Sequence, residues 1–387
     1  MAHHNTILSQ IVALFPRHEF ESLAKEHHVG QKFRSFNRWS QFLAMMVAQL
    51  SGRKSLRDLA ANLQAQGRRL YHLGLRATSR ATLARVNEFQ PHDLYRNLFF
   101  SLLNRCQLYA PKNRFKFNGK IYLLDSTVIN LCLSIFPWAT FRKTKGAIKL
   151  HFGLDADGYL PVFMDMTKGK FHESTWAKAL SLPSGSTVVF DRGFNDYSWY
   201  QSLTDHHVVF ITRLKSNAVF EPLAKRRGRK GQGICGDSRI RLKDMASDLR
   251  IVDFTDSTTG KTYRFLSNSF SLKANVIAEL YKERWKIELF FKWIKQNLRV
   301  KTFLGSSPNA VLTQLWIALC VYLVLTFLKF KAKLGISLTE ILRLLQLNIF
   351  ERRSLVDLLK PPERILNIKN IFTTVYNYNL QYGCSIK

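Results

Sequence analysis

Residues 281–298, YKERWKIELFFKWIKQNL, carry the most informative pattern in this 387-residue chain. The stretch contains neither proline nor glycine and is long enough to predict a helix of several turns. At about 100° per residue, its polar side chains share one stripe and its apolar side chains share the neighbouring stripe. The polar stripe contains Tyr281, Arg284, Glu288 and Lys295, and the apolar stripe contains Ile287, Phe291, Ile294 and Leu298. We therefore expect a helix that buries one face and holds a carboxylate among cations beside it.

The spacing of the polar residues is more specific than the stripe itself. Alone, the stripe is equally typical of a solvated helix face on which Arg284 pairs with Glu288 four residues later. However, the residues fit the pattern Y-x2-R-x3-E-x6-K. This pattern resembles the signature of DDE transposases of the insertion-sequence-four family. A member of that family also needs two carboxylates earlier in the chain.

Two aspartates earlier in the chain follow short apolar runs. Asp125 ends the run IYLLD, and Asp191 ends the run TVVFD immediately before Arg-Gly. Sites in open α/β sheets form where strands end, so both aspartates are candidates for one site. The alternative for each is an ordinary turn or cap role, which for Asp191 taken alone is the favoured one.

The region around these aspartates predicts an α/β unit with a mixed sheet and flanking helices. We expect strands at residues 121–125, 147–154, 159–164, 187–191 and 208–211, and helices at 173–180 and 197–203. Asp155 and Asp157 belong to a predicted hairpin turn between the second and third strands. Asp165 and Asp196 are rival acids, but neither has the apolar run that would place it beside Asp125.

Carboxylates from Asp125, Asp191 and Glu288 would repel one another if they converged, and burying them unpaired would be costly. A divalent cation removes both difficulties, and oxygen ligands of this type suit Mg²⁺ or Mn²⁺. Two such ions about 3.5–4 Å apart can activate a water or a 3′-hydroxyl and stabilise the leaving oxygen of a displacement at phosphorus. The sequence leaves the number of ions open.

The family resemblance covers about residues 125–295 and is weaker in the N-terminal region. It implies a ribonuclease H-like catalytic domain, with a β-rich insertion between the second and third acids. It also implies that Asp125, Asp191 and Glu288 form the catalytic triad and hold the metal. Its members cut DNA at terminal inverted repeats, often through a hairpin, and join the ends to target DNA, which implies double-stranded DNA as partner and a homodimer on paired ends.

The same resemblance assigns roles to other residues of the signature helix. Tyr281, Arg284 and Lys295 would contact DNA phosphate near the cleaved end, as a hydroxyl donor, a bidentate fork and a point charge respectively. Trp285 is not part of the signature, and its place beside Arg284 leaves two alternatives: it stacks on a flipped base or it packs inside the protein.

The charge of the chain also points to a polyanionic partner. It has 58 Lys and Arg against 27 Asp and Glu, a net charge of +31. Nucleic acid is the leading partner and an anionic membrane surface is the rival. The apolar run at residues 315–328 is shorter than the roughly 20 residues of a bilayer span, which favours a buried core helix. Five scattered cysteines without C-x-x-C spacing predict a reducing, cytoplasmic compartment, and the resemblance implies a bacterial nucleoid.

We expect four structural regions along the chain. They are a helical DNA-binding domain at residues 1–115, a catalytic domain at 116–211 and 273–305, a β-rich insertion at 212–272, and a helical region at 306–387. In the first region Ser55 and Ser79 are predicted helix N-caps. The candidate phosphate contacts there are Arg53, Lys54, Arg57, Arg80 and Arg85. An ordinary bundle with a solvated basic face is an equal alternative.

Two further alternatives remain open at the level of sequence. The basic run KRRGRK at residues 225–230 predicts either a contact with a nucleic-acid backbone or a solvated loop. The whole chain is either an active transposase or a non-catalytic DNA-binding relative of one, because intact acids do not by themselves establish activity.

Overall fold

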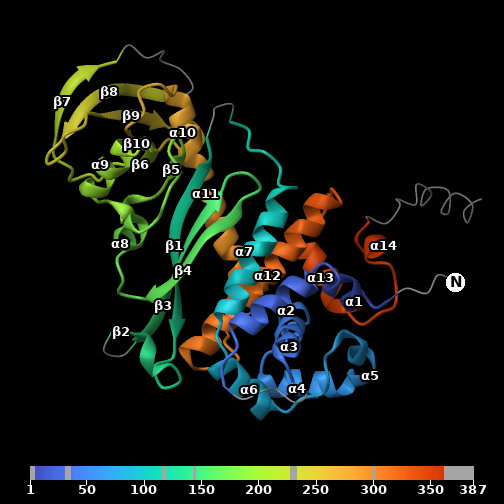
Figure 1. Ribbon diagram of the computed structural model, residues 1–387. Coiled ribbons are helices and arrows are strands. Elements are labelled where there is room, and N and C mark those ends of the chain that lie inside the picture. Colours follow the sequence, from blue (N-terminus) through green and yellow to red (C-terminus); the bar gives the residue numbers. More distant parts are fainter. Residues whose placement is uncertain are drawn as a thin grey trace, which may run out of the picture.

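A mixed sheet organises the computed structural model, which describes residues 5–30, 36–115, 119–142, 145–226, 233–298, 300 and 302–360 (Figure 1). Its strands are β1 (Ile121–Leu131), β2 (Thr140–Arg142), β3 (Lys145–Asp155), β4 (Leu160–Lys168), β5 (Thr187–Val189), β6 (Val209–Arg213), β7 (Phe220–Lys225), β8 (Ile234–Leu242), β9 (Leu249–Thr255) and β10 (Thr262–Ser267). In the described residues the order is β2-β3-β1-β5-β6-β10-β9-β8-β7, with β4 also paired to β3. Only the pairs β1–β5 and β5–β6 in this order are parallel.

Helices cover both faces of the centre of the sheet. On one face lie α8 (Glu173–Lys178) and α9 (Tyr197–Asp205), packed on Leu124 and Phe190. On the other face lie α10 (Ala274–Glu283) and α11 (Trp285–Asn297), packed with the cluster that contains Leu123 and Val189. Because side chains alternate along a strand, Asp125 and Asp191 project toward the second face, together with Leu123 and Val189.

The predicted β-rich insertion is present, but its strands extend the main sheet. β10 pairs antiparallel with β6, and β9, β8 and β7 follow in turn. Figure 1 shows these strands at one end of the molecule, with α10 lying along them. β6 pairs with β5 on one edge, and β10 satisfies the backbone hydrogen-bonding groups on its other edge.

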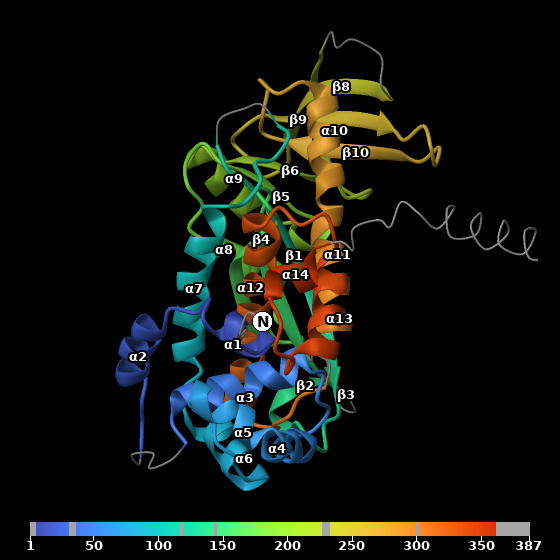
Figure 2. The same cartoon turned by 90° about the vertical axis from the view of Figure 1, so that its right-hand side faces the viewer.

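The apolar run at residues 315–328 lies within α12 (Pro308–Lys331), which runs through the helical half of the molecule (Figure 2). The helix is long and apolar enough to cross a membrane, yet 83% of its most apolar window is buried. It packs against α3 (Arg38–Leu50), α6 (Arg80–Phe89) and α7 (Asp93–Gln107). A helix that is apolar on all sides is expected at such a buried position, so the predicted core helix is confirmed.

The helices α3 to α6 lie at the end of the molecule away from β7–β10, and α7 runs alongside the sheet (Figures 1 and 2). The helices not yet named are α1 (Ile7–Val12), α2 (Arg17–Glu26), α4 (Leu56–Ala65), α5 (Gly67–Leu70), α13 (Leu338–Asn348) and α14 (Leu355–Leu359), with short 3-10 turns at Tyr71–Leu73, Pro137–Ala139 and Arg192–Phe194. Both predicted N-caps are confirmed. Ser55 and Ser79 accept hydrogen bonds at 3.1 Å from the amides of Asp58 and Thr82, respectively.

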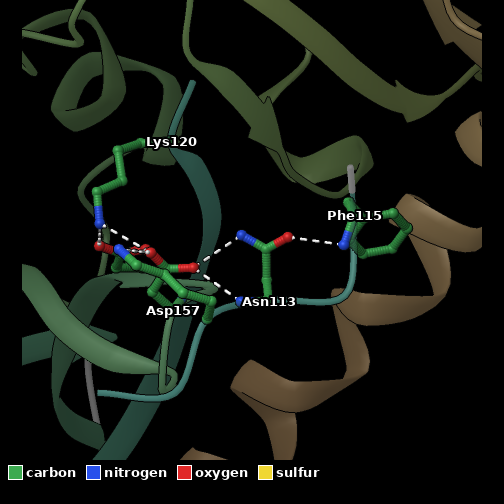
Figure 3. Close-up of polar contacts among 6 residues, drawn as sticks. Asn113, Phe115, Lys120 and Asp157 are labelled. Carbon is green, nitrogen blue, oxygen red and sulfur yellow. Dashed lines mark hydrogen bonds and ion pairs between the residues drawn. The ribbon is translucent and has the colours of Figure 1, made fainter. Parts of the chain in front are cut away.

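The turn between β3 and β4 fastens the segment after α7 to the sheet (Figure 3). Asp157 Oδ1 accepts hydrogen bonds from the amide and side chain of Asn113 at 2.9 and 2.8 Å, and Oδ2 accepts from Lys112 and Lys120 at 3.1 Å each. Lys120 also donates to Asp155 at 2.7 Å. Burial opposes the charge, but these bonds hold the pKa of Asp157 well below its ordinary value. Asp157 lies in the turn, as predicted, whereas the prediction for Asp155 is wrong, because Asp155 is the last residue of β3 and pairs with Leu160.

Replacing Asp157 with asparagine should destabilise the protein by about 1.5–3 kcal/mol at pH 7, because the donors lose a charged partner. A lowered folded-state pKa gives stability that is fully present above the unfolded value near 4 and is lost as the pH falls from there through the folded-state pKa. Urea unfolding should therefore show a gap between variant and wild type that is full at pH 7 and is narrower at pH 2.

The matched control is Asp165→Asn, which removes an exposed acid from neighbouring β4. This change should leave stability within about 0.5 kcal/mol of the wild type. A loss for Asp157→Asn that is the same at both pH values would contradict the charged clamp.

Candidate active site

Asp125 and Asp191 lie side by side at the point where β5 ends. The parallel register of β1 and β5 ends with Leu123 opposite Val189, and each aspartate comes two residues later in its strand direction. Neighbouring strands are about 4.8 Å apart, so the two carboxylates share one edge. The prediction that Asp125 ends its strand is wrong, because β1 continues to Leu131 along β3. Asp125 instead lies just beyond Leu123, the last residue of β1 that pairs with β5.

A break in the signature helix lies directly over these aspartates. The predicted single helix at residues 281–298 is wrong, since α10 ends at Glu283 and α11 begins at Trp285. Arg284 forms the junction: its amide donates to the Tyr281 carbonyl at 3.2 Å, and its carbonyl accepts from Ile287 at 3.1 Å. These three-residue spacings tighten the turn locally, and α11 then packs on β1. The apolar stripe of Ile287, Phe291, Ile294 and Leu298 is buried, as predicted.

Arg284 joins two of the three predicted acids. Its Nη1 donates to Asp125 Oδ2 at 3.0 Å and its Nη2 donates to Glu288 Oε1 at 2.5 Å. Burial raises the pKa of Asp125 to about 7. Arg284 opposes this rise in the pKa, whereas the negative charges of Asp191 and Glu288 add to it. All three acids therefore lie within electrostatic reach of one another.

The carboxylates fit a divalent cation in chemistry, although not in their present geometry. In the described residues, no three His, Cys, Asp or Glu side chains are close enough together to hold a metal ion as they stand. The Arg284 guanidinium bridges Asp125 and Glu288 in this arrangement. Its Nε is a buried donor with no hydrogen-bond partner in the described part of the chain, which suits an anionic ligand such as phosphate. The oxygen donors of the three acids match Mg²⁺ or Mn²⁺.

The other signature residues take separate positions around the acids. Lys295 donates to Thr127 Oγ1 and, at 3.3 Å, to the Val128 carbonyl. The Tyr281 ring lies 4.8 Å from the ring of Phe265, with the Arg284 guanidinium 5.7 Å from its centre. Trp285 is 57% exposed, so the alternative that it packs inside is wrong.

The sequence did not predict a role for Glu173, which lies on α8 at the face of the sheet opposite to α11. Glu173 accepts a hydrogen bond from Ser126 Oγ and pairs with Lys149 at 3.4 Å. The sequence predicted Glu173 merely as the start of a helix. An acid at a loop-to-helix junction between the two aspartates was the available signal, but its partner across the sheet is invisible without the strand register.

Residues 116–324 match the family model described as a transposase DDE domain, and residues 3–76 match a domain of unknown function, DUF4372. The chain belongs to the DDE transposase family. Enzymes of this family cleave and join DNA with divalent metal ions. Their domain accounts for the mixed sheet with flanking helices, which confirms the predicted fold class.

Relatives of this transposase come from three bacteria. A protein named as a transposase from Sinorhizobium fredii is 30% identical over 72% of this chain and 80% of its own length. The transposase of insertion sequence element IS5377 from Geobacillus stearothermophilus is 25% identical over 88% and 90% of the two chains. That of element IS4SA from Synechocystis is 24% identical over 72% and 80%. The piggyBac transposase synaptic complex with hairpin DNA matches with a TM-score of 0.44 and 11% identity over 95% of this chain and 82% of that chain, a score too low to establish a common fold.

Replacing Asp125 with asparagine should stabilise the metal-free transposase at high pH. A pKa raised from 3.8 to about 7 means that the native state binds this proton more tightly than the unfolded chain, so stability falls as the pH rises from about 4 through 7. The asparagine variant should match the wild type near pH 4 and exceed it by on the order of 1–4 kcal/mol at pH 8 in urea unfolding.

The exposed acid Asp165 provides the control, since its asparagine variant should follow the wild type at both pH values. If the Asp125→Asn variant is less stable than the wild type at pH 8, the ionised Asp125 carboxylate is not destabilised by burial and by the neighbouring acids.

Proposed function

We propose that this transposase binds the terminal inverted repeats of an insertion sequence and catalyses metal-dependent cleavage and strand transfer, with Asp125, Asp191 and Glu288 as its catalytic triad. One observation carries the proposal: two aspartates stand in register on parallel strands, and one guanidinium links Asp125 to Glu288 on the helix above. The partners would be the inverted repeats and target DNA, and the place of action the bacterial cytoplasm at the nucleoid.

The three acids would hold Mg²⁺ or Mn²⁺, two ions in the proposal, which activate a water or 3′-hydroxyl and stabilise the leaving oxygen. Arg284 neutralises Asp125 and Glu288 before the substrate arrives. Its planar fork fits a phosphate as well as it fits two carboxylates, so we expect the guanidinium to move onto the DNA backbone during loading. This movement frees the two acids for the cation.

Lys295 and Trp285 would orient the DNA end along α11. Lys295 lies seven residues beyond Glu288, about 10 Å along the helix, and provides a point charge for the next part of the backbone. Trp285 presents an exposed ring at the start of the same helix. Such a ring can stack on an unpaired base, which supports a flipped nucleotide near the cleaved bond.

A basic groove beside the N-terminal helices supports a second DNA contact. It has a volume of about 450 Å³ and lies between the start of α4, α6 and the segment 303–307. Lys54, Arg57 and Arg80 line it, and none of the three forms an ion pair within the described chain. The other two predicted phosphate contacts differ, since Arg53 pairs with Asp58 at 3.3 Å and Arg85 does not line the groove.

The walls of the groove suit phosphate for an additional reason. The first residues of α4 and α12 line it, so the positive ends of these two helix dipoles lie beside the same space, and α6 runs along it with Arg80, Ala84 and Glu88. Glu88 is the one acid in its lining. We assign this groove to the backbone of duplex DNA, which favours the DNA-binding interpretation of the N-terminal region over a merely solvated basic face.

The groove and the acids are spaced for one DNA segment. From Asp125, β1 runs about 20 Å to Leu131, and Ile135 and Phe136 beyond it already line the groove. One helical turn of duplex DNA is about 34 Å, so a single end can reach both places. Paired ends would need two copies, which supports a homodimer on DNA. Most of the basic run at residues 225–230 lies outside the described residues.

Replacing Glu288 with alanine should leave binding of cognate end DNA intact and reduce Mg²⁺-dependent nicking by about 10³-fold or more. Gel shifts measure the first property and cleavage of labelled ends the second. The matched control is Glu279→Ala, which removes a half-exposed acid from α10 and should keep full cleavage. Nicking retained by Glu288→Ala would refute the triad, and binding without nicking in the wild type would identify a non-catalytic relative.

A triple variant in which Lys54, Arg57 and Arg80 are all replaced with glutamine should bind both cognate and unrelated DNA duplexes more weakly than the wild type. The plot of log affinity against log salt should become shallower by about 2–3, because fewer counterions are released. Fluorescence anisotropy across salt concentrations measures both quantities.

The control variant carries glutamine at the exposed cations Arg343, Arg352 and Arg353, none of which lines the groove. It removes the same total charge and should change the salt slope less. Equal slopes for the two triple variants would show that the groove does not hold the DNA backbone.

A further inference from the structure

Glu173 lies behind the two aspartates, on the opposite face of the sheet. It is the first residue of α8, which packs on the face formed by Leu124 and Phe190. Asp125 and Asp191 project to the other face, toward α11. The side chain of Glu173 is 22% exposed and approaches both strands from below. It is therefore well placed to act on the aspartates through their neighbours.

The first of these connections runs through Ser126. The hydroxyl of Ser126 donates to Glu173 Oε1, while its amide donates to Asp125 Oδ1 at 2.8 Å. Ser126 points to the α8 face because it follows Asp125 in the strand. One residue thus ties the Asp125 carboxylate to Glu173 across the thickness of the sheet.

The second connection runs through Gly193, whose amide donates to Asp191 Oδ1 at 2.7 Å. A Cβ at Gly193 would meet Glu173 Oε2 at 2.1 Å and Asp191 Oδ1 at 2.9 Å. Glu173 Oε2 and Asp191 Oδ1 are therefore at most about 5 Å apart. The Glu173 carboxylate occupies the space that a side chain at position 193 would need. The turn that sets Asp191 is packed directly against the Glu173 carboxylate.

Glu173 is itself held in a defined place. Lys149 on β3 contacts Glu173 Oε1 at 3.4 Å and donates to the Phe171 carbonyl at 3.0 Å. One helical turn later, Trp176 stacks on the buried ring of His151, with the ring centres 5.0 Å apart. The start of α8 is thereby anchored to β3, and its carboxylate has little freedom to leave the aspartates.

We propose that Glu173 is a positioning residue that fixes both aspartates of the triad at once, Asp125 through Ser126 and Asp191 through Gly193. The inference rests on the proposed function, because it concerns the geometry of that same site. Two like charges on adjacent strands tend to turn apart unless their surroundings hold them. Groups behind metal ligands commonly contribute 10- to 100-fold to metal affinity or activity.

The test measures Mn²⁺ binding to the full-length protein and cleavage of cognate ends in parallel. Glu173→Ala and Ser126→Ala should each weaken Mn²⁺ binding and slow cleavage by about 10–100-fold, without loss of end binding. The double variant should be no worse than Glu173→Ala, because both changes break one connection. Glu173→Gln keeps an acceptor for Ser126 and should recover most of the loss.

Gly193→Ala provides a test by non-additivity. In the wild type its Cβ should displace the Glu173 carboxylate and impair both readouts. In the Glu173→Ala background the 2.1 Å contact is gone and the 2.9 Å contact with Asp191 Oδ1 is left, so the added loss should be smaller than in the wild type. Asp165→Ala is the control, and it should leave Mn²⁺ binding and cleavage unchanged.

Wild-type Mn²⁺ affinity and cleavage in Glu173→Ala would overturn the proposal, as would fully additive effects of Glu173→Ala and Ser126→Ala. A glutamine variant as damaging as alanine would also overturn it and would indicate a direct role for the charge. These results are separable from a failure of the proposed function, which would appear as cleavage by Glu288→Ala whatever residue occupies position 173.

Discussion

Repulsion among carboxylates collected at the end of β5 is the constraint on which the rest of this structure depends. Asp125 and Asp191 are forced together by the register of two parallel strands, and Glu288 faces them from α11. Burial raises the pKa of Asp125 most, and the negative charges of Asp191 and Glu288 raise it further. Arg284 balances part of that charge by bridging Asp125 and Glu288. In the proposed function, a divalent cation takes over this role from the guanidinium.

The remainder of the molecule keeps these groups in place. The sheet has helices on both faces at its centre, so the acids stand on paired strands and on a helix packed against β1. Sites on such elements are held more precisely than sites on loops. The basic groove that we propose to bind DNA lies near the N-terminal helices at the far end of β1, so one strand connects it to the acids. In this proposal the net charge of +31 attracts DNA to both places.

Local signals in the sequence predicted much of this fold, and long-range pairing explains what they missed. The caps at Ser55 and Ser79 and the turn containing Asp157 depend on neighbouring residues, so they were predictable. The break at Arg284 was not, because a continuous periodic pattern does not reveal a tertiary bond to Asp125. Glu173 escaped notice for the same reason, since its partner Ser126 is 47 residues away. The signature spacing made Glu288 a candidate site residue, whereas its contact with Arg284 required the structure.

Anomalous diffraction from crystals grown with Mn²⁺ and a cognate DNA end at pH 8 tests the central claim most directly. The account predicts Mn²⁺ between Asp125 and Asp191, with the Arg284 guanidinium moved from the carboxylates to a phosphate. At that pH Asp125 is ionised, since its pKa is about 7. Mn²⁺ bound elsewhere, with Arg284 still bridging Asp125 and Glu288, would contradict a metal-dependent site at this edge of the sheet.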